Sequence, residues 1–305
     1  LNERSWLHSP CFDLSVLERP VLSLDIRTLT QNGLDGAVVQ MNATGSTAME
    51  NAWVTIGALN STSNWYNHSG LPGNPGLQNL NQYGWSGESG QPGWQNALIS
   101  LDNFLPVDPA NRQKIRFRVA FGSQGSNQRR DLDGFAFDNF KIAERNRIVL
   151  VESFTHITPP SPNTNINSTI DGFALQPVTY APKTELIKME YHLSTPTVDA
   201  INMANPVDHN ARAAFYGVTA VPSIRIDADF KTTPFLQWAN QIFEQRSLKA
   251  APISIDNITI LSDEPHLLKV QTQFTVLEDL PPNTLLHIAV VEKWCKPMPL
   301  RTGML

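Results

Sequence analysis

Residues 130–154 read RDLDGFAFDNFKIAERNRIVLVESF, and this stretch decides how the chain is organised. In its first half apolar and polar residues alternate, which is typical of a strand with one face on a core, and Asn139 interrupts the alternation. In its second half the apolar run IVLV at 148–151 is typical of a strand covered on both faces. Only residues 143–147 separate the two patterns, which is too few for a free linker. The stretch therefore predicts two different folds joined by a short connection.

The composition favours a secreted, β-rich protein. The chain has 305 residues, enough for two or three domains, with 17% charged residues and a net charge of −5. This balance argues against a nucleic-acid partner. No run approaches the roughly 20 apolar residues of a membrane span, and the first residues do not resemble a signal peptide. We expect an extracellular or cell-surface location and no transmembrane segment. Because Cys11 and Cys295 fall in different predicted domains, no disulfide framework is expected.

Residues 1–144 predict an antiparallel sandwich of the jelly-roll kind. Between the predicted strands, residues 59–93 have many Gly, Pro and Asn residues and no periodicity. This segment also holds several aromatic residues, which need a surface to pack against, so we expect a long ordered loop. The predicted strands are 20–26, 37–41, 53–57, 94–101, 113–122 and the first half of 130–154.

Six short motifs in this domain carry a family resemblance. They are SPCFDLS (9–15), DGAVVQ (35–40), NWYN (64–67), GWSGES (84–89), RFRVAFGS (116–123) and DGFAFDNFKI (133–142). In this order they resemble the MAM-type, lectin-like jelly rolls of bacterial surface proteins exported by the type IX secretion route. Such sandwiches normally carry a strand and a Trp-rich segment before the first motif, so this domain is expected to be short of its first strands. Either that segment has been cut, or another chain completes the sheet by strand addition.

Polar oxygen groups in this domain are candidate ligands for Ca²⁺, which prefers carboxylate and amide oxygens. The resemblance implies a structural calcium held by an aspartate of the last strand, so Asp138 is the first candidate. The alternative is that these Asp-Gly and Asp-Asn pairs serve turns and a bulge. The candidates, expected at strand ends or turns, are Asp35, Asp133, Asp138 and Asn139.

Aromatic residues of the long loop allow two interpretations. Aromatic rings with an exposed face stack on the CH groups of sugars, which would make this loop a glycan-binding platform. Alternatively, the rings hold the loop onto the sandwich. The residues concerned are Trp65, Tyr66, Tyr83 and Trp85.

Residues 145–250 predict an α/β domain, because strand and helix patterns alternate. Asp208 is the expected N-cap of the first helix, which ends at Gly217. The predicted strands are 148–154, 186–191 and 218–227, and the predicted helices are 209–216 and 235–248.

The segment YGVTAVPSIRID at 216–227 resembles the segment of thioredoxin-like proteins in which a Val-Pro bond is cis and faces the redox site. The resemblance implies a cis Val221–Pro222 bond, which makes Pro222 a structural residue. A CxxC motif should follow the first strand in such a domain, but residues 156–163 read HITPPSPN and the domain contains no cysteine. Thiol–disulfide exchange is therefore excluded there, and a spacer or docking module is favoured. His156, His192 and His209 lack zinc-ligand spacing, so no catalytic or zinc site is expected.

Residues 251–305 predict three strands, at 253–260, 267–277 and 285–292, which resemble the start of an immunoglobulin-like or fibronectin-like sandwich. Both ends of the sequence fall inside predicted domains, so a longer intact protein is expected. Together the patterns predict a multidomain, mainly β, non-catalytic protein of the cell surface or the extracellular space. It would serve in adhesion, surface assembly or filament formation, with other copies of itself or other surface proteins as partners. The alternative is a glycan-binding module of a larger secreted enzyme, whose catalytic domain lies outside this segment.

Overall fold

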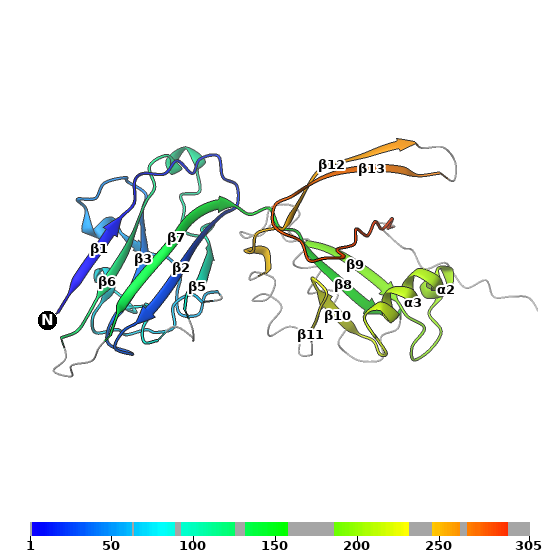
Figure 1. The fold of residues 1–305 in the computed structure, drawn as a ribbon, viewed down its shortest axis with the longest axis horizontal. Coiled ribbons are helices and arrows are strands. Elements are labelled where there is room, and N and C mark those ends of the chain that lie inside the picture. Colours follow the sequence, from blue (N-terminus) through cyan, green and yellow to red (C-terminus); the bar gives the residue numbers. More distant parts are fainter. Residues whose placement is uncertain are drawn as a thin grey trace, which may run out of the picture. The chain divides into compact units, whose positions relative to one another are not determined.

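The computed structural model describes residues 2–62, 64–88, 93–125, 132–157, 186–231, 246–262 and 267–291. The fold is mainly β, as the sequence predicted, with 39% strand and 12% helix in several sheets (Figure 1). The chain divides into two compact units, Leu1–Arg145 and Asn146–Leu305.

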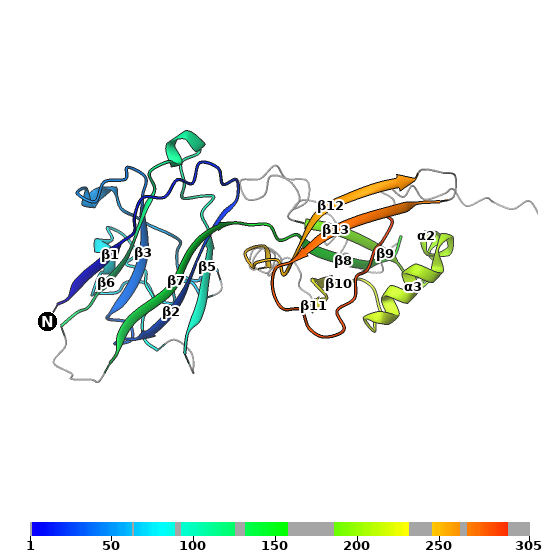
Figure 2. The ribbon, with the colours of Figure 1, turned by 45° about the horizontal axis from the view of Figure 1, so that its top comes forward.

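The first unit contains two antiparallel sheets. One has the strand order β1-β6-β3-β4 and the other the order β5-β2-β7, and the two sheets form separate layers in both views (Figures 1 and 2). The strands are β1 (Arg4–His8), β2 (Pro20–Leu29), β3 (Gly36–Asn42), β4 (Val54–Thr55), β5 (Gln95–Ser100), β6 (Arg116–Gly122) and β7 (Gly134–Glu144).

Both sheets contribute to one apolar core. Leu22 and Leu24 of β2 are fully buried, as is Val38 of β3, and Phe117 of β6 is almost so. Leu22, Leu24 and Ile26 alternate along β2, so successive apolar side chains reach the same face of the sheet. At about 25 cal/mol per Å² of apolar surface, this burial is the main stabilising contribution to the unit.

The predicted irregularity in β7 is confirmed. Ser23 pairs with Lys141 and Asp25 pairs with Asp138, so two residues of β7 oppose the single residue between them on β2. Asn139 adopts a φ of 51°, which is the left-handed conformation that Asn tolerates better than most residues. Asp138 and Asn139 therefore lie inside the strand at a bulge, and their expected position at a strand end or turn was wrong.

The second unit is built on a sheet with the order β11-β10-β8-β9. β8 and β9 are parallel, whereas β10 is antiparallel to both β8 and β11. Phe154, Leu193 and Ala213 form a small core between the sheet and a helix. The elements are β8 (Val149–Thr155), β9 (Leu186–His192), α2 (Ala200–Ala204), α3 (Pro206–Phe215), β10 (Ser223–Ile226) and β11 (Asp229–Lys231).

Local details of this unit differ from the prediction. α3 begins at Pro206, and its N-cap is Asn205 rather than Asp208, because the Asn205 side chain accepts the backbone N–H of Asp208. The sequence patterns did not predict α2. The Val221–Pro222 bond is cis, as predicted, and Thr195–Pro196 is also cis. The predicted helix 235–248 lies mostly outside the described residues.

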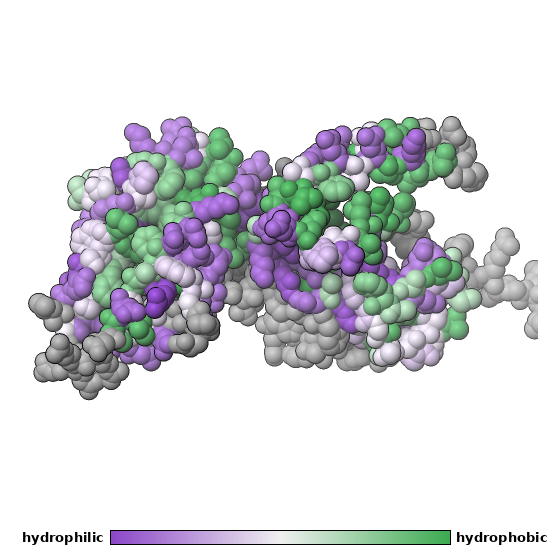
Figure 3. Space-filling view, in the orientation of Figure 1, coloured by the Kyte–Doolittle hydropathy of each residue, from purple (hydrophilic) through white to green (hydrophobic). Residues whose placement is uncertain are grey.

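The last described part is a two-stranded antiparallel hairpin of β12 (Ile253–Ser262) and β13 (Lys269–Val276). Several of its apolar residues are exposed, among them Ile255, Ile258 and Phe274, and apolar and hydrophilic residues alternate along it (Figure 3). The third strand predicted at 285–292 was wrong for residues 285–291, which form no strand.

Candidate functional site: a polar cluster at the ends of β8 and β9

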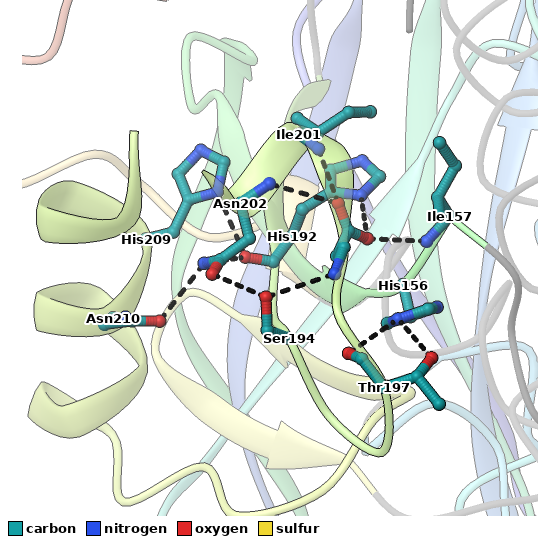
Figure 4. Close-up of polar contacts among 10 residues, drawn as sticks. His156, Ile157, His192, Ser194, Thr197, Ile201, Asn202, His209 and Asn210 are labelled. Carbon is teal, nitrogen blue, oxygen red and sulfur yellow. Dashed lines mark hydrogen bonds and ion pairs between the residues drawn. The ribbon is translucent and has the colours of Figure 1, made fainter. Parts of the chain in front are cut away.

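The carboxyl ends of β8 and β9 meet at one edge of the sheet of the second unit. The two strands are parallel, with Thr155 opposite His192 at their last pair. In open α/β sheets, ligands bind outside the carboxyl ends of the strands. The polar side chains that gather here are therefore the first candidates for a functional site (Figure 4).

Asp199 lies at the centre of this cluster and is fully buried. Its Oδ1 atom accepts the backbone N–H groups of Ile201 and Asn202, at 2.7 and 3.0 Å, which makes it the N-cap of α2. Its Oδ2 atom accepts the Ile157 N–H at 2.6 Å and the His192 Nδ1–H at 3.0 Å. A carboxylate has about four acceptor positions, so all of those of Asp199 are filled.

The electrostatics of Asp199 follow from these contacts. Burial acts to raise the pKa of Asp199, because it penalises the charged form. Hydrogen bonds from His192 and from the backbone of Asn202 and Ile157 outweigh burial, so the pKa of Asp199 lies below its usual value. The carboxylate is therefore a stable anion that organises the donors around it.

Two histidines are fixed in one tautomer by the same contacts. Because a carboxylate and a carbonyl only accept, His192 donates its Nδ1–H to Asp199, and His209 donates its Nδ1–H to the carbonyl of His192 at 3.0 Å. When neutral, both rings carry their lone pair on Nε2. Their centroids are 6.4 Å apart. Two imidazoles bound tetrahedrally to one ion would have centroids about 5 Å apart, so this arrangement does not fit one tetrahedral zinc ion.

The remaining polar groups of the cluster join the loop after β9 to its neighbours. The Ser194 hydroxyl donates to Asn202 Oδ1 and accepts the Asp199 N–H. The Asn202 amide donates to the carbonyl of His192 and to Asn210 of α3. His156, after β8, contacts the carbonyl and the hydroxyl of Thr197 through Nε2. The cluster thus connects both strands, α2 and α3.

The contacts of this cluster join the strand ends to the helices. Within the described residues, no hydroxyl or thiol forms a hydrogen bond with His192 Nε2. Sequence reasoning missed the cluster, because His156, His192 and His209 come together only through the pairing of β8 with β9. Asp199 directly before the helical residues of α2 was the one available local signal.

A second polar network attaches α3 to β8. Glu152 is 1% exposed and accepts two hydrogen bonds from Arg212, at 2.7 and 3.1 Å. The Tyr216 hydroxyl donates to Glu152 at 2.5 Å. Burial and the Glu152 charge together raise the pKa of Tyr216 to about 12. Tyr216 therefore keeps its proton at neutral pH and remains a donor.

The predicted calcium ligands are not gathered at one place. Asp138 and Asn139 lie at the bulge opposite Asp25, whose carboxylate accepts the Asn139 amide at 2.7 Å. Asp133 forms an exposed ion pair with Arg27. Asp35 accepts the Gln124 N–H in the turn before β3. Among the described residues, no group of three His, Cys, Asp or Glu side chains is placed to hold a metal ion.

The predicted sugar platform is largely buried. Trp65, Tyr66 and Trp85 are at most 2% exposed, and Tyr83 packs partly buried against the same core. Their polar atoms bond within the unit, since the Trp65 indole donates to the Ile56 carbonyl and the Tyr66 hydroxyl contacts the backbone of Val39. The rings hold the loop onto the sheets, so they offer no open platform to a sugar.

Two further findings bear on identity. No helix in the part of the chain that the structure describes is long and apolar enough to cross a membrane. No family model, curated protein or solved structure matches the chain.

Proposed function

We propose that the chain is a non-catalytic, modular part of a secreted or cell-surface protein, used in adhesion, surface assembly or filament formation. The observation that carries the proposal is the saturated carboxylate of Asp199. It occupies the strand edge where an α/β domain would hold its reactive groups, and it is fully engaged in joining loops. A buried carboxylate whose acceptor positions are all filled by groups of its own chain supports a rigid framework at this edge.

The strand arrangement of the second unit supports a thioredoxin-like module without redox chemistry. β8 and β9 are parallel, β10 is antiparallel to β8, and the cis bond Val221–Pro222 immediately precedes β10. The only cysteines, Cys11 and Cys295, lie outside residues 145–250. Without a thiolate at this position, disulfide exchange has no nucleophile.

The two-layer first unit supports a jelly-roll module of the MAM or lectin type. Its sheets are antiparallel and share one core, and its long loop packs onto that core through buried aromatic rings. The low charged fraction of 17% favours the extracellular location. By analogy of fold, modules of this kind serve on cell surfaces as rigid spacers and contact domains.

An attachment assay with a His192 variant tests whether the chain acts in assembly or through the chemistry of the His192 imidazole. Particles coated with the full chain are expected to attach to one another, measured by light scattering, whereas particles coated with an unrelated globular protein of similar net charge are not. His192→Asn keeps a donor near the Nδ1 position and removes Nε2, so it should leave attachment unchanged. A strong loss with His192→Asn in a folded protein would assign chemistry to the imidazole and contradict the proposal. Coated particles that stay dispersed would contradict it as well.

A further inference from the structure

We infer that the free edge of β7 pairs with β7 of a second copy of this chain, antiparallel and across a twofold axis. The inference rests on the proposed assembly function and deepens it by naming the partner and the contact. β7 spans Gly134–Glu144 and is the last strand in the order β5-β2-β7. Within the described residues it pairs only with β2, so its other edge presents unpaired N–H and C=O groups.

The core-facing side of β7 is incompletely covered. Its apolar residues pack against the same core as β2 yet are only partly buried, whereas Leu22 and Leu24 of β2 are 0% exposed. This difference between neighbouring strands indicates that one more strand fits beside β7. A second β7 would bring four further apolar side chains to this sheet. They are Phe135, Phe137, Phe140 and Ile142.

The bulge makes β7 self-complementary. Phe137 and Ile142 face the core on either side of it, while Asp138 and Lys141 are exposed on the other face. With the twofold axis between Asn139 and Phe140, Phe137 opposes Ile142 of the second copy. Asp138 then opposes Lys141, and the symmetry produces this ion pair twice. Opposite charges at directly opposed positions stabilise an antiparallel pair.

The proposed register is favoured over registers that are shifted by one or two residues. A shift by one residue would place core-facing side chains against exposed ones. A shift by two would keep the faces matched but would separate Asp138 from Lys141. The two bulges meet at the axis, so the regular halves on either side remain free to pair.

Charge reversal with rescue tests the contact. The full chain is expected to dimerise in a concentration series followed by sedimentation. Asp138→Lys and Lys141→Asp should each raise the dissociation constant by roughly tenfold, because like charges then face each other twice. The double variant Asp138→Lys/Lys141→Asp should restore dimerisation, which a merely structural effect would not do. Lys114→Asp, an exposed charge reversal beside β6 of the other sheet, is the matched control and should change nothing.

A crosslink provides the second measurement. Ala136 opposes Ala143 of the second copy in this register, so Ala136→Cys/Ala143→Cys in a Cys11→Ser/Cys295→Ser background should give a reducible covalent dimer. Lys114→Cys in the same background should not. A monomeric wild-type chain, a double reversal that fails to rescue, or the absence of the crosslink would each overturn the β7 contact. Coated particles that still attach would then leave the proposed function standing without this contact.

Discussion

At the scale of residues, Asp199 shows how a buried charge is made tolerable. Its negative charge is compensated by three backbone N–H groups and one imidazole N–H. Charge-assisted hydrogen bonds of this type are stronger than neutral ones. The side chain therefore fixes α2, the strand ends and the loop between them at once.

Asp199→Ala should lower the free energy of unfolding by about 3 kcal/mol, because the helix loses its cap and buried donors lose their acceptor. Urea unfolding followed by circular dichroism measures this. The matched control Asp13→Ala removes an exposed aspartate that bonds only to nearby Ser15, and it should have little effect. Equal effects of the two substitutions would refute the central role of Asp199.

The pH dependence follows from the lowered pKa of Asp199. The folded state holds the pKa of Asp199 below its unfolded value of about 4. The ionised carboxylate therefore stabilises the fold fully at pH values above that unfolded value. This stabilisation is lost as the pH falls from that value through the pKa of Asp199 in the folded state. Asp199→Asn should therefore reduce the loss of stability between neutral pH and acid pH, measured as unfolding free energy at a series of pH values. A variant with an unchanged pH profile would contradict the assignment.

Removing Arg212 alone is predicted to destabilise the protein more than removing Arg212 and Glu152 together. Arg212→Met leaves a buried carboxylate without its guanidinium partner, with the Tyr216 hydroxyl still donating, and should cost about 3 kcal/mol. Glu152→Met/Arg212→Met removes both charges and should recover much of that loss. Chemical denaturation of the two variants makes the comparison. A double variant that is less stable than Arg212→Met would show that the pair is net stabilising.

At the scale of elements, the bulge of β7 has a local conformational cause. Asn139→Ala and Asn139→Gly both remove the amide that bonds to Asp25. Only alanine is strained at a φ of 51°, so Asn139→Ala should be less stable than Asn139→Gly by about 1 kcal/mol. Thermal unfolding of both variants tests this. Equal stabilities would mean that the bulge relaxes to another conformation.

The sequence predicted elements with strong local patterns and missed those set by distant contacts. β2 and β6 were predicted because apolar residues alternate along their sequences, and β3 was predicted from its β-branched residues after the Asp35–Gly36 turn. Residues 285–291 were predicted as a strand from composition, but a strand needs a neighbour to pair with, which no local pattern reveals. The start of α3 was misplaced because Asn205 and Asp208 are both good caps, and only the fold selects between them.

The same limit applies to the candidate site. The histidines and Asp199 meet because parallel pairing brings His192 beside the end of β8. The aromatic residues of the long loop were found from the sequence, yet their burial could not be decided, because a ring that stacks on a sugar and a ring that packs on a core have the same composition signal. Burial is a property of the folded unit, not of the motif.

At the scale of the whole molecule, the division at Arg145 predicts two separately unfolding units. The chain has seven tryptophans, of which positions 6, 53, 65, 85 and 94 fall in the first unit. Trp65 and Trp85 are buried, so tryptophan fluorescence should follow mainly the first unit. Asn139→Ala should shift that transition, whereas Arg212→Met should leave its midpoint unchanged and shift a transition seen by circular dichroism. If both substitutions moved both transitions equally, the units would be unfolding as one cooperative body, and the two folds predicted on either side of residues 143–147 would not be independent.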